Sequence, residues 1–151
     1  KLTAFVAPIT SKTTLVYNQD LANAGAFGVK AAERDTAGNI LVAGKNRRSE
    51  IGGYVRVVYK TNIFKDNSVN LLTKLDLFSN YIENPQNIDV SWETIITFKV
   101  NKFISASLTT HLIYDDDVKI GIDTTGDGKL DSKGPRTQFK EVIAIGFSYK
   151  F

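Results

Sequence analysis

Residues 141–151 read EVIAIGFSYKF, and this stretch decides the fold. Every second residue is large and apolar: Ile143, Ile145, Phe147, Tyr149 and Phe151. The residues between them are small or polar, which is the alternation of a β-strand with one apolar face. An apolar, aromatic-tipped strand that ends on phenylalanine is typical of the closing strand of a bacterial outer-membrane β-barrel, whose exterior faces lipid and whose interior faces water.

The remaining composition restricts the fold without deciding it. A length of 151 residues predicts a single domain over 1–151, and a hydrophobic fraction of 42% is compatible with a soluble protein. No apolar run approaches the roughly 18 residues that a membrane-spanning helix needs. Any membrane crossing is therefore expected to be made by strands.

Charge and cysteine content point to no nucleic-acid partner and to no thiolate chemistry. The chain has no cysteine, and its formal charge of +3 is scattered. The one basic cluster, Lys45, Arg47 and Arg48, is read as a solubilising loop. The alternative is binding of anionic lipid headgroups or a polyanion.

Period two also organises the chain upstream. Four more segments alternate apolar with polar or small residues, namely 104–114, 91–100, 69–81 and 51–60. A sixth strand is expected near 2–16, where Pro8 and the run 10–14 obscure which residues share a face. The polar rows of these strands carry charges of mixed sign: Arg56, Lys60, Lys74, Asp76, Glu93 and Lys99.

Connection lengths and aromatic positions predict an antiparallel up-and-down transmembrane β-barrel. Residues 65–68 and 101–102 are tight turns, whereas 18–46 and 115–136 are long and polar, with 83–89 on the same side. Short periplasmic turns and long extracellular loops are the arrangement of outer-membrane barrels, which places the C-terminus on the periplasmic side. Two aromatic belts are expected, Tyr81, Trp92, Tyr114 and Phe139 near the long loops and Tyr59, Phe98, Tyr149 and Phe151 near the short turns.

A soluble β-sandwich or lipocalin-like ligand-binding barrel stays open as an alternative. Its core face would also be apolar and alternating, because period two does not say which face is buried. That alternative gives no reason for the rim placement of the aromatic residues or for the terminal Phe151.

Several stretches resemble a family of Bacteroidota outer-membrane barrel proteins of unknown function. In the second half they are 89–94 (DVSWET), 102–106 (KFISA), 111–117 (HLIYDDD), 138–142 (QFKEV) and 146–151 (GFSYKF). Residues 22–29 (ANAGAFGV), 75–81 (LDLFSNY) and 84–86 (NPQ) look like the same family. The resemblance implies an outer-membrane location and supplies no activity. Members look longer on the N-terminal side, with additional strands.

The strand count agrees with that difference. A closed transmembrane barrel takes at least about 8 strands, and the sequence offers six. Edge N–H and C=O groups in hydrocarbon are costly, so further strands are required. We expect the chain to be the C-terminal portion of a larger barrel; symmetry-related copies are the alternative source. Residues 27–43 are expected to form only a loop hairpin, with 28–30 and 40–42 flanking the turn 35–38.

His111, the only histidine, is the one candidate for catalysis. Its row also carries Thr109 and Asp115, which invites comparison with a hydrolase triad. Side chains at i and i+2 of a strand lie nearly 7 Å apart, too far for the hydrogen bonds of a triad. We expect His111 to hydrogen-bond within a polar interior, and we expect no enzymatic activity.

Residues 123–131 form the candidate metal site. Asp123, Thr125, Asp127 and Asp131 stand at positions 1, 3, 5 and 9 of a calcium-type loop, with Gly128 at position 6. Position 12 is Gly134 rather than glutamate, so a solvated turn is the alternative to a Ca²⁺ site.

The expected function is that of a non-catalytic outer-membrane β-barrel, a structural or partner-binding subunit that acts through its extracellular loops. A diffusion channel or porin-like transporter is the alternative within the class. Expected partners are outer-membrane lipid and lipopolysaccharide, other outer-membrane proteins, and the barrel-assembly machinery. The assembly machinery would read Ile143, Ile145, Phe147, Tyr149 and Phe151 as its signal.

Overall fold

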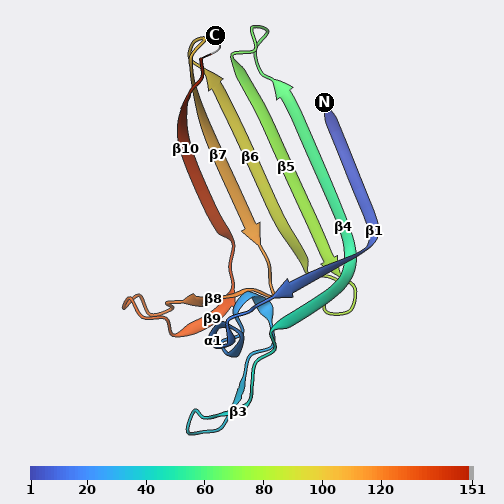
Figure 1. Ribbon diagram of the computed structural model, residues 1–151, viewed down its shortest axis with the longest axis vertical. Coiled ribbons are helices and arrows are strands. Elements are labelled where there is room, and N and C mark those ends of the chain that lie inside the picture. Colours follow the sequence, from blue (N-terminus) through green and yellow to red (C-terminus); the bar gives the residue numbers. More distant parts are fainter. Residues whose placement is uncertain (150–151) are drawn as a thin grey trace.

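The computed structural model describes residues 1–149, and in it the chain is all-β, with 59% of its residues in strands. One antiparallel sheet has the order β1-β4-β5-β6-β7-β10 (Figure 1). Its strands are Leu2–Leu15, Arg47–Asn62, Val69–Asn80, Ile88–Lys99, Ile104–Tyr114 and Gln138–Phe147. All six predicted strands are present, but the last one ends at Phe147 and was predicted to continue to Phe151, which lies outside the described residues.

Neighbouring strands in the sheet are also consecutive along the chain, once the hairpins inside the long loops are set aside. Residues 63–68 and 100–103 connect strands at one end, whereas 16–46, 81–87 and 115–137 connect them at the other. The expected division into a short-turn end and a long-loop end is therefore confirmed. In Figure 1 the long loops gather below the sheet.

The sheet is a single layer with two chemically different faces. Side chains alternate along each strand, so residues paired in register lie on the same face. The apolar face carries Val55, Val57, Leu71, Leu75, Leu77, Trp92, Ile96, Phe98, Leu108, Leu112, Ile143 and Ile145. The polar face carries Arg56, Lys60, Lys74, Asp76, Ser91, Glu93, Lys99, Ser105, Ser107, Thr109, His111 and Lys140. One register row of this face also contains the apolar residues Leu72, Ile95 and Val142.

Nothing in residues 1–149 covers the apolar face as a second layer would. Trp92 is 50% exposed, and Ile143 and Ile145 are 77% and 79% exposed. The buried apolar side chains are Val16, Ala22, Val29 and Phe78, and the first three pack inside a loop. A sheet normally buries its apolar face against another element, so this face needs a cover that the described residues do not supply.

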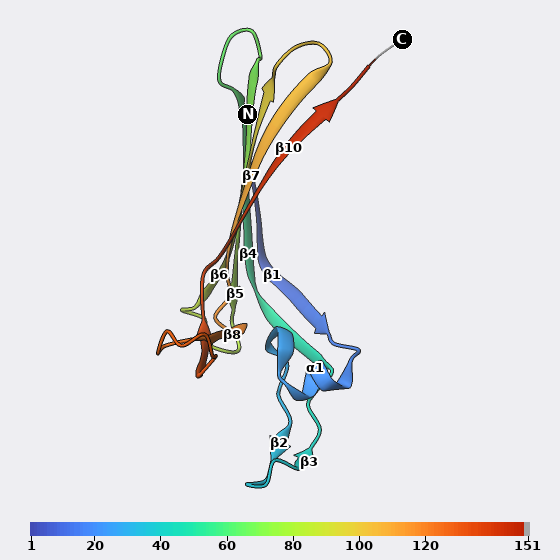
Figure 2. The ribbon, with the colours of Figure 1, turned by 90° about the vertical axis from the view of Figure 1, so that its left-hand side faces the viewer.

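The long-loop ends of β1 and β4 bend out of the sheet together, and Figure 2 shows them turning away from β5 and β6. On β1, Pro8 and Ile9 stand opposite Gly53 alone, which makes a β-bulge between Ala7 and Thr10. On β4, a Cβ at Gly52 would collide with the carbonyl oxygen of Ser79, so the close approach requires glycine. We call residues 10–15 and 47–52 the arm.

The first long loop contains helix α1 (Gln19–Asn23), the 3₁₀ helix η1 (Ala26–Gly28) and a hairpin. The Asn18 side chain caps α1 by accepting from Leu21 N at 3.0 Å. The hairpin pairs β2 (Glu33–Arg34) with β3 (Ile40–Val42) around the predicted turn at 35–38. Its first strand was predicted wrongly at 28–30, because residues 26–28 coil into η1 instead.

The last long loop carries a hairpin that the sequence pattern did not reveal. Strands β8 (Lys119–Ile122) and β9 (Ser132–Pro135) pair antiparallel, with the Asp- and Gly-rich residues 123–131 between them. Each strand has only four residues, too short for a period-two pattern to stand out.

The sheet is open within the part of the chain that the structure describes. Hydrogen-bonded pairing ends at β1 on one side and at β10 on the other, so both strands have an unpaired edge between Lys1 and Tyr149. Among the same residues, no helix combines the length and the apolar character needed to cross a membrane.

Candidate functional site: a polar cluster at the long-loop end

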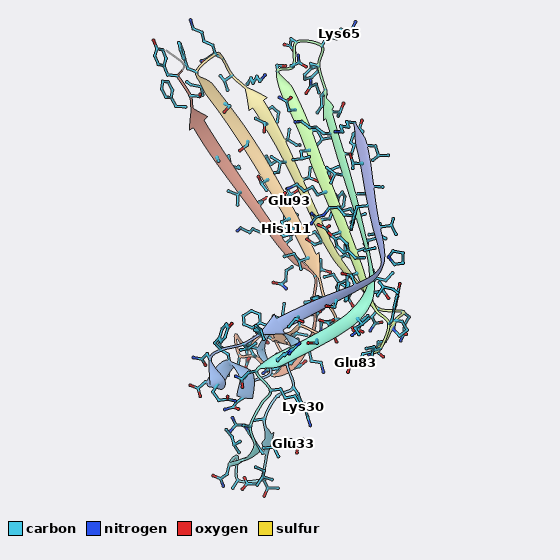
Figure 3. All side chains as sticks on the ribbon, turned by 45° about the vertical axis from the view of Figure 1, so that its right-hand side comes forward. Lys30, Glu33, Lys65, Glu83, Glu93 and His111 are labelled. Carbon is cyan, nitrogen blue, oxygen red and sulfur yellow. The ribbon has the colours of Figure 1, made fainter. Side chains whose placement is uncertain are left out.

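Charged side chains form two ion pairs on the polar face, which we call the charge ladder; Figure 3 labels Glu93 of this ladder and His111 on the neighbouring strand. Arg56 Nε lies 2.5 Å from Asp76 Oδ1, and the Tyr54 hydroxyl also donates to Asp76. On the next strand pair, Lys74 Nζ lies 2.8 Å from Glu93 Oε1. The sequence predicted these charges to be of mixed sign and to share one face, and the register sets two pairs of opposite charges directly side by side, Arg56 with Asp76 and Lys74 with Glu93.

His111 lies beside this ladder, as the register partner of Glu93. Its Nε2 lies 2.8 Å from Ser91 Oγ on the neighbouring strand. The third residue of the imagined triad is elsewhere, since Asp115 lies beyond the end of β7 and binds Lys12. His111 was expected to hydrogen-bond within a polar interior; it makes a hydrogen bond on the polar face of an open sheet, and the interior stays a prediction.

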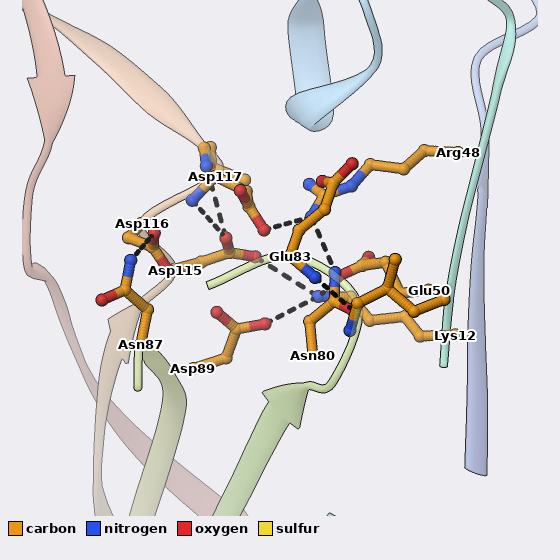
Figure 4. Close-up of polar contacts among 12 residues, drawn as sticks. Lys12, Arg48, Glu50, Asn80, Glu83, Asn87, Asp89, Asp115, Asp116 and Asp117 are labelled. Atoms are coloured by element: carbon orange, nitrogen blue, oxygen red, sulfur yellow. Dashed lines mark hydrogen bonds and ion pairs between the residues drawn. The ribbon is translucent and has the colours of Figure 1, made fainter. Parts of the chain in front are cut away.

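A second polar cluster lies where the arm faces the loop ends of β6 and β7 (Figure 4). Lys12 Nζ on the arm lies 2.9 Å from Asp89 Oδ2 and 3.4 Å from Asp115 Oδ2. Arg48, also on the arm, binds Asp117 and lies 2.9 Å from Glu50 Oε1. We call Lys12, Arg48, Glu50, Asp89, Asp115 and Asp117 the rim cluster.

The rim cluster joins strands that are not neighbours in the sheet. Lys12 belongs to β1 and Asp89 to β6, with β4 and β5 between them. In a flat sheet three strand spacings would separate them by roughly 14 Å, beyond the reach of a lysine side chain. The contact forms because the arm folds over the polar face. The polar face is therefore the concave side of the sheet at this end.

The bulge on β1 is what turns Lys12 toward the cluster. Before the bulge, Thr3, Phe5 and Ala7 have the parity of the polar face. The extra residue reverses that parity, so Thr10, Lys12 and Thr14 follow on the same face. Neither Lys12 nor Glu50 was predicted from the sequence to belong to a site. Two sequence features could have indicated the bulge and the bend. They are Pro8 followed by polar residues on β1, and Gly52-Gly53 on the partner strand.

Glu50 is the most enclosed member of the rim cluster. It is 2% exposed, and its Oε2 has no hydrogen-bond partner in residues 1–149. Lys12 Nζ lies 3.8 Å from that oxygen. Neighbouring cations compensate the charge of a buried carboxylate. Removal of one cation would leave that charge uncompensated where little water reaches it.

A groove of about 380 Å³ adjoins the rim cluster on the polar face. Phe78, which is buried, lies in its wall, and Lys12 Nζ sits 5.3 Å from the centre of the Phe78 ring. Asp76, Asp89 and Asp115 are the carboxylates that line it. This volume is in the range of small-molecule sites, which begin near 300 Å³.

The predicted calcium residues lie on the tip of the β8–β9 hairpin, away from the rim cluster. Asp123 accepts from the backbone N–H groups of Gly126 at 2.6 Å and Gly128 at 2.7 Å, and Asp131 accepts from Thr124 Oγ1 at 2.8 Å. In residues 1–149 no three acidic, histidine or cysteine side chains converge as a metal site. Calcium binding stays a prediction, and an isothermal titration without heat at millimolar Ca²⁺ would remove it.

The same turn shifts the ionisation of its aspartates. The backbone N–H of Gly128, followed by that of Gly126, lowers the pKa of Asp123 below its usual 3.8. The backbone and then the hydroxyl of Thr124 lower the pKa of Asp131 in the same direction. Both shifts arise because hydrogen bonds favour the charged carboxylate.

Within the described residues, the side chains of the predicted assembly signal are exposed to solvent. Ile143, Ile145 and Phe147 lie along the apolar face of β10, and Phe147 is 75% exposed. Beyond the strand, the Tyr149 ring stacks on Phe103 at a centroid distance of 5.7 Å. The prediction for Phe151 lies outside the described residues.

Comparisons with known proteins add no family to this picture. No family model matches the chain, and no curated protein and no solved structure matches it either.

Proposed function

We propose that this chain forms the wall of a non-catalytic outer-membrane β-barrel, in which the apolar face meets lipid and the long loops bind a partner. One observation carries the proposal: a single-layer sheet has a largely apolar face that no part of residues 1–149 covers. Contiguous apolar surface of this kind marks a membrane or a protein interface. Strands from outside the described sheet would complete the barrel along the edges of β1 and β10.

The direction of bending supports the same assignment. A soluble lipocalin-like barrel would close with its apolar face inside. In this sheet the arm folds over the polar face, and the contact of Lys12 with Asp89 lies on that concave side. A transmembrane barrel closes in this direction, with polar residues inside and apolar residues outside.

One register row interrupts the apolar face. It contains Thr73, Thr94, Thr110 and Glu141. Thr73 Oγ1 lies 2.9 Å from Thr94 Oγ1 and accepts from Trp92 Nε1 at 2.8 Å, so these groups satisfy one another. Glu141 makes no ion pair within residues 1–149, and nothing in the structure explains its place on this face.

Trp92 allows a direct test, because it is the only tryptophan and lies on the apolar face. The protein is reconstituted into vesicles that contain phospholipids brominated along their acyl chains. We expect the bromines to quench Trp92 fluorescence strongly. In a matched variant, Trp92→Phe with Ser107→Trp, the tryptophan moves to the polar face and should be quenched weakly.

Two results would overturn the proposal. Equal quenching of the two tryptophan positions would mean that lipid does not distinguish the faces. A protein that stays folded and monomeric without detergent or lipid would be a soluble domain.

A passive diffusion channel is the second candidate. The observation that favours it is the mixed charge along the polar face, where Arg56, Asp76, Lys74 and Glu93 would line water in a wide barrel. In a narrow barrel the same ladder would fill the interior. Conductance across a planar bilayer separates the two: stepwise ion currents support a channel, and a silent membrane supports a structural subunit.

A further inference from the structure

We propose that the groove beside the rim cluster binds a small organic cation that carries a primary ammonium or guanidinium group. The groove lies on the polar face at the long-loop end, so the inference does not depend on what covers the apolar face. It rests on the charge balance of the rim cluster, on one buried carboxylate and on the shape of the groove.

The charge balance leaves the rim cluster negative. Four carboxylates, those of Glu50, Asp89, Asp115 and Asp117, surround two cations, Lys12 and Arg48. Two negative charges therefore have no counterpart within the cluster. In a partly enclosed site this surplus attracts a further cation more strongly than exposed carboxylates in water would.

The second observation is the orphaned oxygen of Glu50. Oε2 is enclosed, has no hydrogen-bond partner in the described residues, and faces Lys12 Nζ at 3.8 Å. Glu50 and Asp89 both attract the Lys12 ammonium group, which lies closer to Asp89, at 2.9 Å. Glu50 is not among the residues that line the groove, so it adds to the negative charge around Lys12 and does not contact the bound cation.

The groove supplies the place for that cation. Asp89, Asp115 and Asp76 line it, together with Tyr54 and Ser91. Asp76 is already balanced by Arg56, so Asp89 and Asp115 are the expected ligands. Phe78 gives the groove an aromatic wall, which suits an organic cation better than a hydrated metal ion.

Lys12 itself displays the chemistry that the groove recognises. Its ammonium group contacts carboxylates and lies 5.3 Å from the centre of the Phe78 ring. The Lys12 side chain lines the groove, so its ammonium group already lies at the edge of the proposed site. An external ammonium group would bind beside it, and Lys12 would oppose that binding through like-charge repulsion.

The test is a titration of the full chain with spermidine, at constant ionic strength, in whichever of buffer or non-ionic detergent keeps the protein folded. Removal of a carboxylate by Asp89→Asn should weaken binding by about tenfold. Removal of the resident cation by Lys12→Gln should tighten binding by about tenfold. Gain of affinity cannot result from loss of fold, which keeps the second variant informative if the first unfolds.

Matched controls make the same charge changes away from the groove. Asp66→Asn lies in the turn between β4 and β5, and Lys60→Gln lies at the short-turn end of the polar face. Each should change the affinity by less than about threefold, because charges beyond a Debye length are largely screened. Weaker or unchanged binding by Lys12→Gln, or an equal response of the control variants, would overturn the proposed site.

Discussion

The regular part of the sheet and its long-loop end are built from the same strands but are held together differently. In the regular part, residues such as Leu75 and Trp92 face their register partners, and the contacts follow from strand pairing alone. At the long-loop end, Lys12 reaches Asp89 across two intervening strands. The comparison shows that local alternation organises the faces, whereas irregular backbone positions assemble the charged site.

The largest effect is expected from a charge placed on the apolar face of the regular part. Ile143→Lys should block insertion or destabilise the inserted protein by about 2–4 kcal/mol, the cost of lysine near the bilayer midplane, because Ile143 lies one apolar row further from the short-turn rim than Ile145. Heat-modifiable migration on gels and unfolding by urea in lipid vesicles measure the change.

The neighbouring residue provides the control for that experiment. Ala144 pairs with Ser107 and lies on the polar face, so Ala144→Lys should assemble almost normally. If the two variants behave alike, the difference between the faces does not govern assembly.

The next effect tests the long-loop end. Arg48→Met leaves Glu50, which is 2% exposed, with Lys12 as its remaining cation. We expect a loss of about 3 kcal/mol in unfolding free energy, because removing one partner of a buried ion pair leaves the charge of the other partner uncompensated. The double variant Arg48→Met with Glu50→Leu should recover much of the loss.

An exposed pair on the regular part gives the contrast. The Arg56 side chain is 50% exposed, so Arg56→Met should cost less than about 1 kcal/mol. Equal losses of unfolding free energy for Arg48→Met and Arg56→Met would mean that burial does not increase the cost of losing an ion pair at the long-loop end.

A backbone substitution should separate the arm from the sheet. Gly52→Ala places a Cβ against the Ser79 carbonyl oxygen, so the arm has to shift, at a cost of about 2 kcal/mol. Gly146→Ala is the control, since its Cβ would meet only the Ser105 hydroxyl at 3.3 Å. Urea denaturation measures both, and faster amide exchange in residues 10–15 of Gly52→Ala would locate the shift.

The smallest effect is expected from pH at the β8–β9 turn. The folded protein holds the pKa of Asp123 below the usual 3.8, so this carboxylate stabilises the turn above pH 3.8. That contribution is lost as the pH falls through the lower, folded value. Carboxyl carbon NMR shifts should show Asp123 titrating below pH 3.8, and a midpoint at or above it would contradict the hydrogen bonds to Gly126 and Gly128.

Much of the sheet could be predicted from the sequence because alternation is a local property. The segments around Trp92, His111 and Ile145 show both the strand and the face without knowledge of any partner. The short β8 and β9 strands were missed for the converse reason, as four residues carry too little alternation. The hairpin at 28–30 was misplaced because η1, held by Gly25 and Gly28 at positive φ, competes there.

The candidate site was less predictable because its members are distant in sequence and near in space. Lys12 and Asp115 are more than a hundred positions apart, and each looks like an ordinary loop or strand residue by itself. Their meeting depends on the bulge at Pro8-Ile9, which reverses the parity of β1, and on Gly52, which lets β4 bend with it.

The sequence by itself determined the strands, the apolar and polar rows and the alternation of short turns with long loops, because a strand's side-chain period acts over a few residues. Only the tertiary structure decided that the sheet bends toward its polar face and brings Lys12, Glu50 and Asp89 together. That bend arises from a two-against-one mismatch between β1 and β4, and such a mismatch exists only once the two strands are paired.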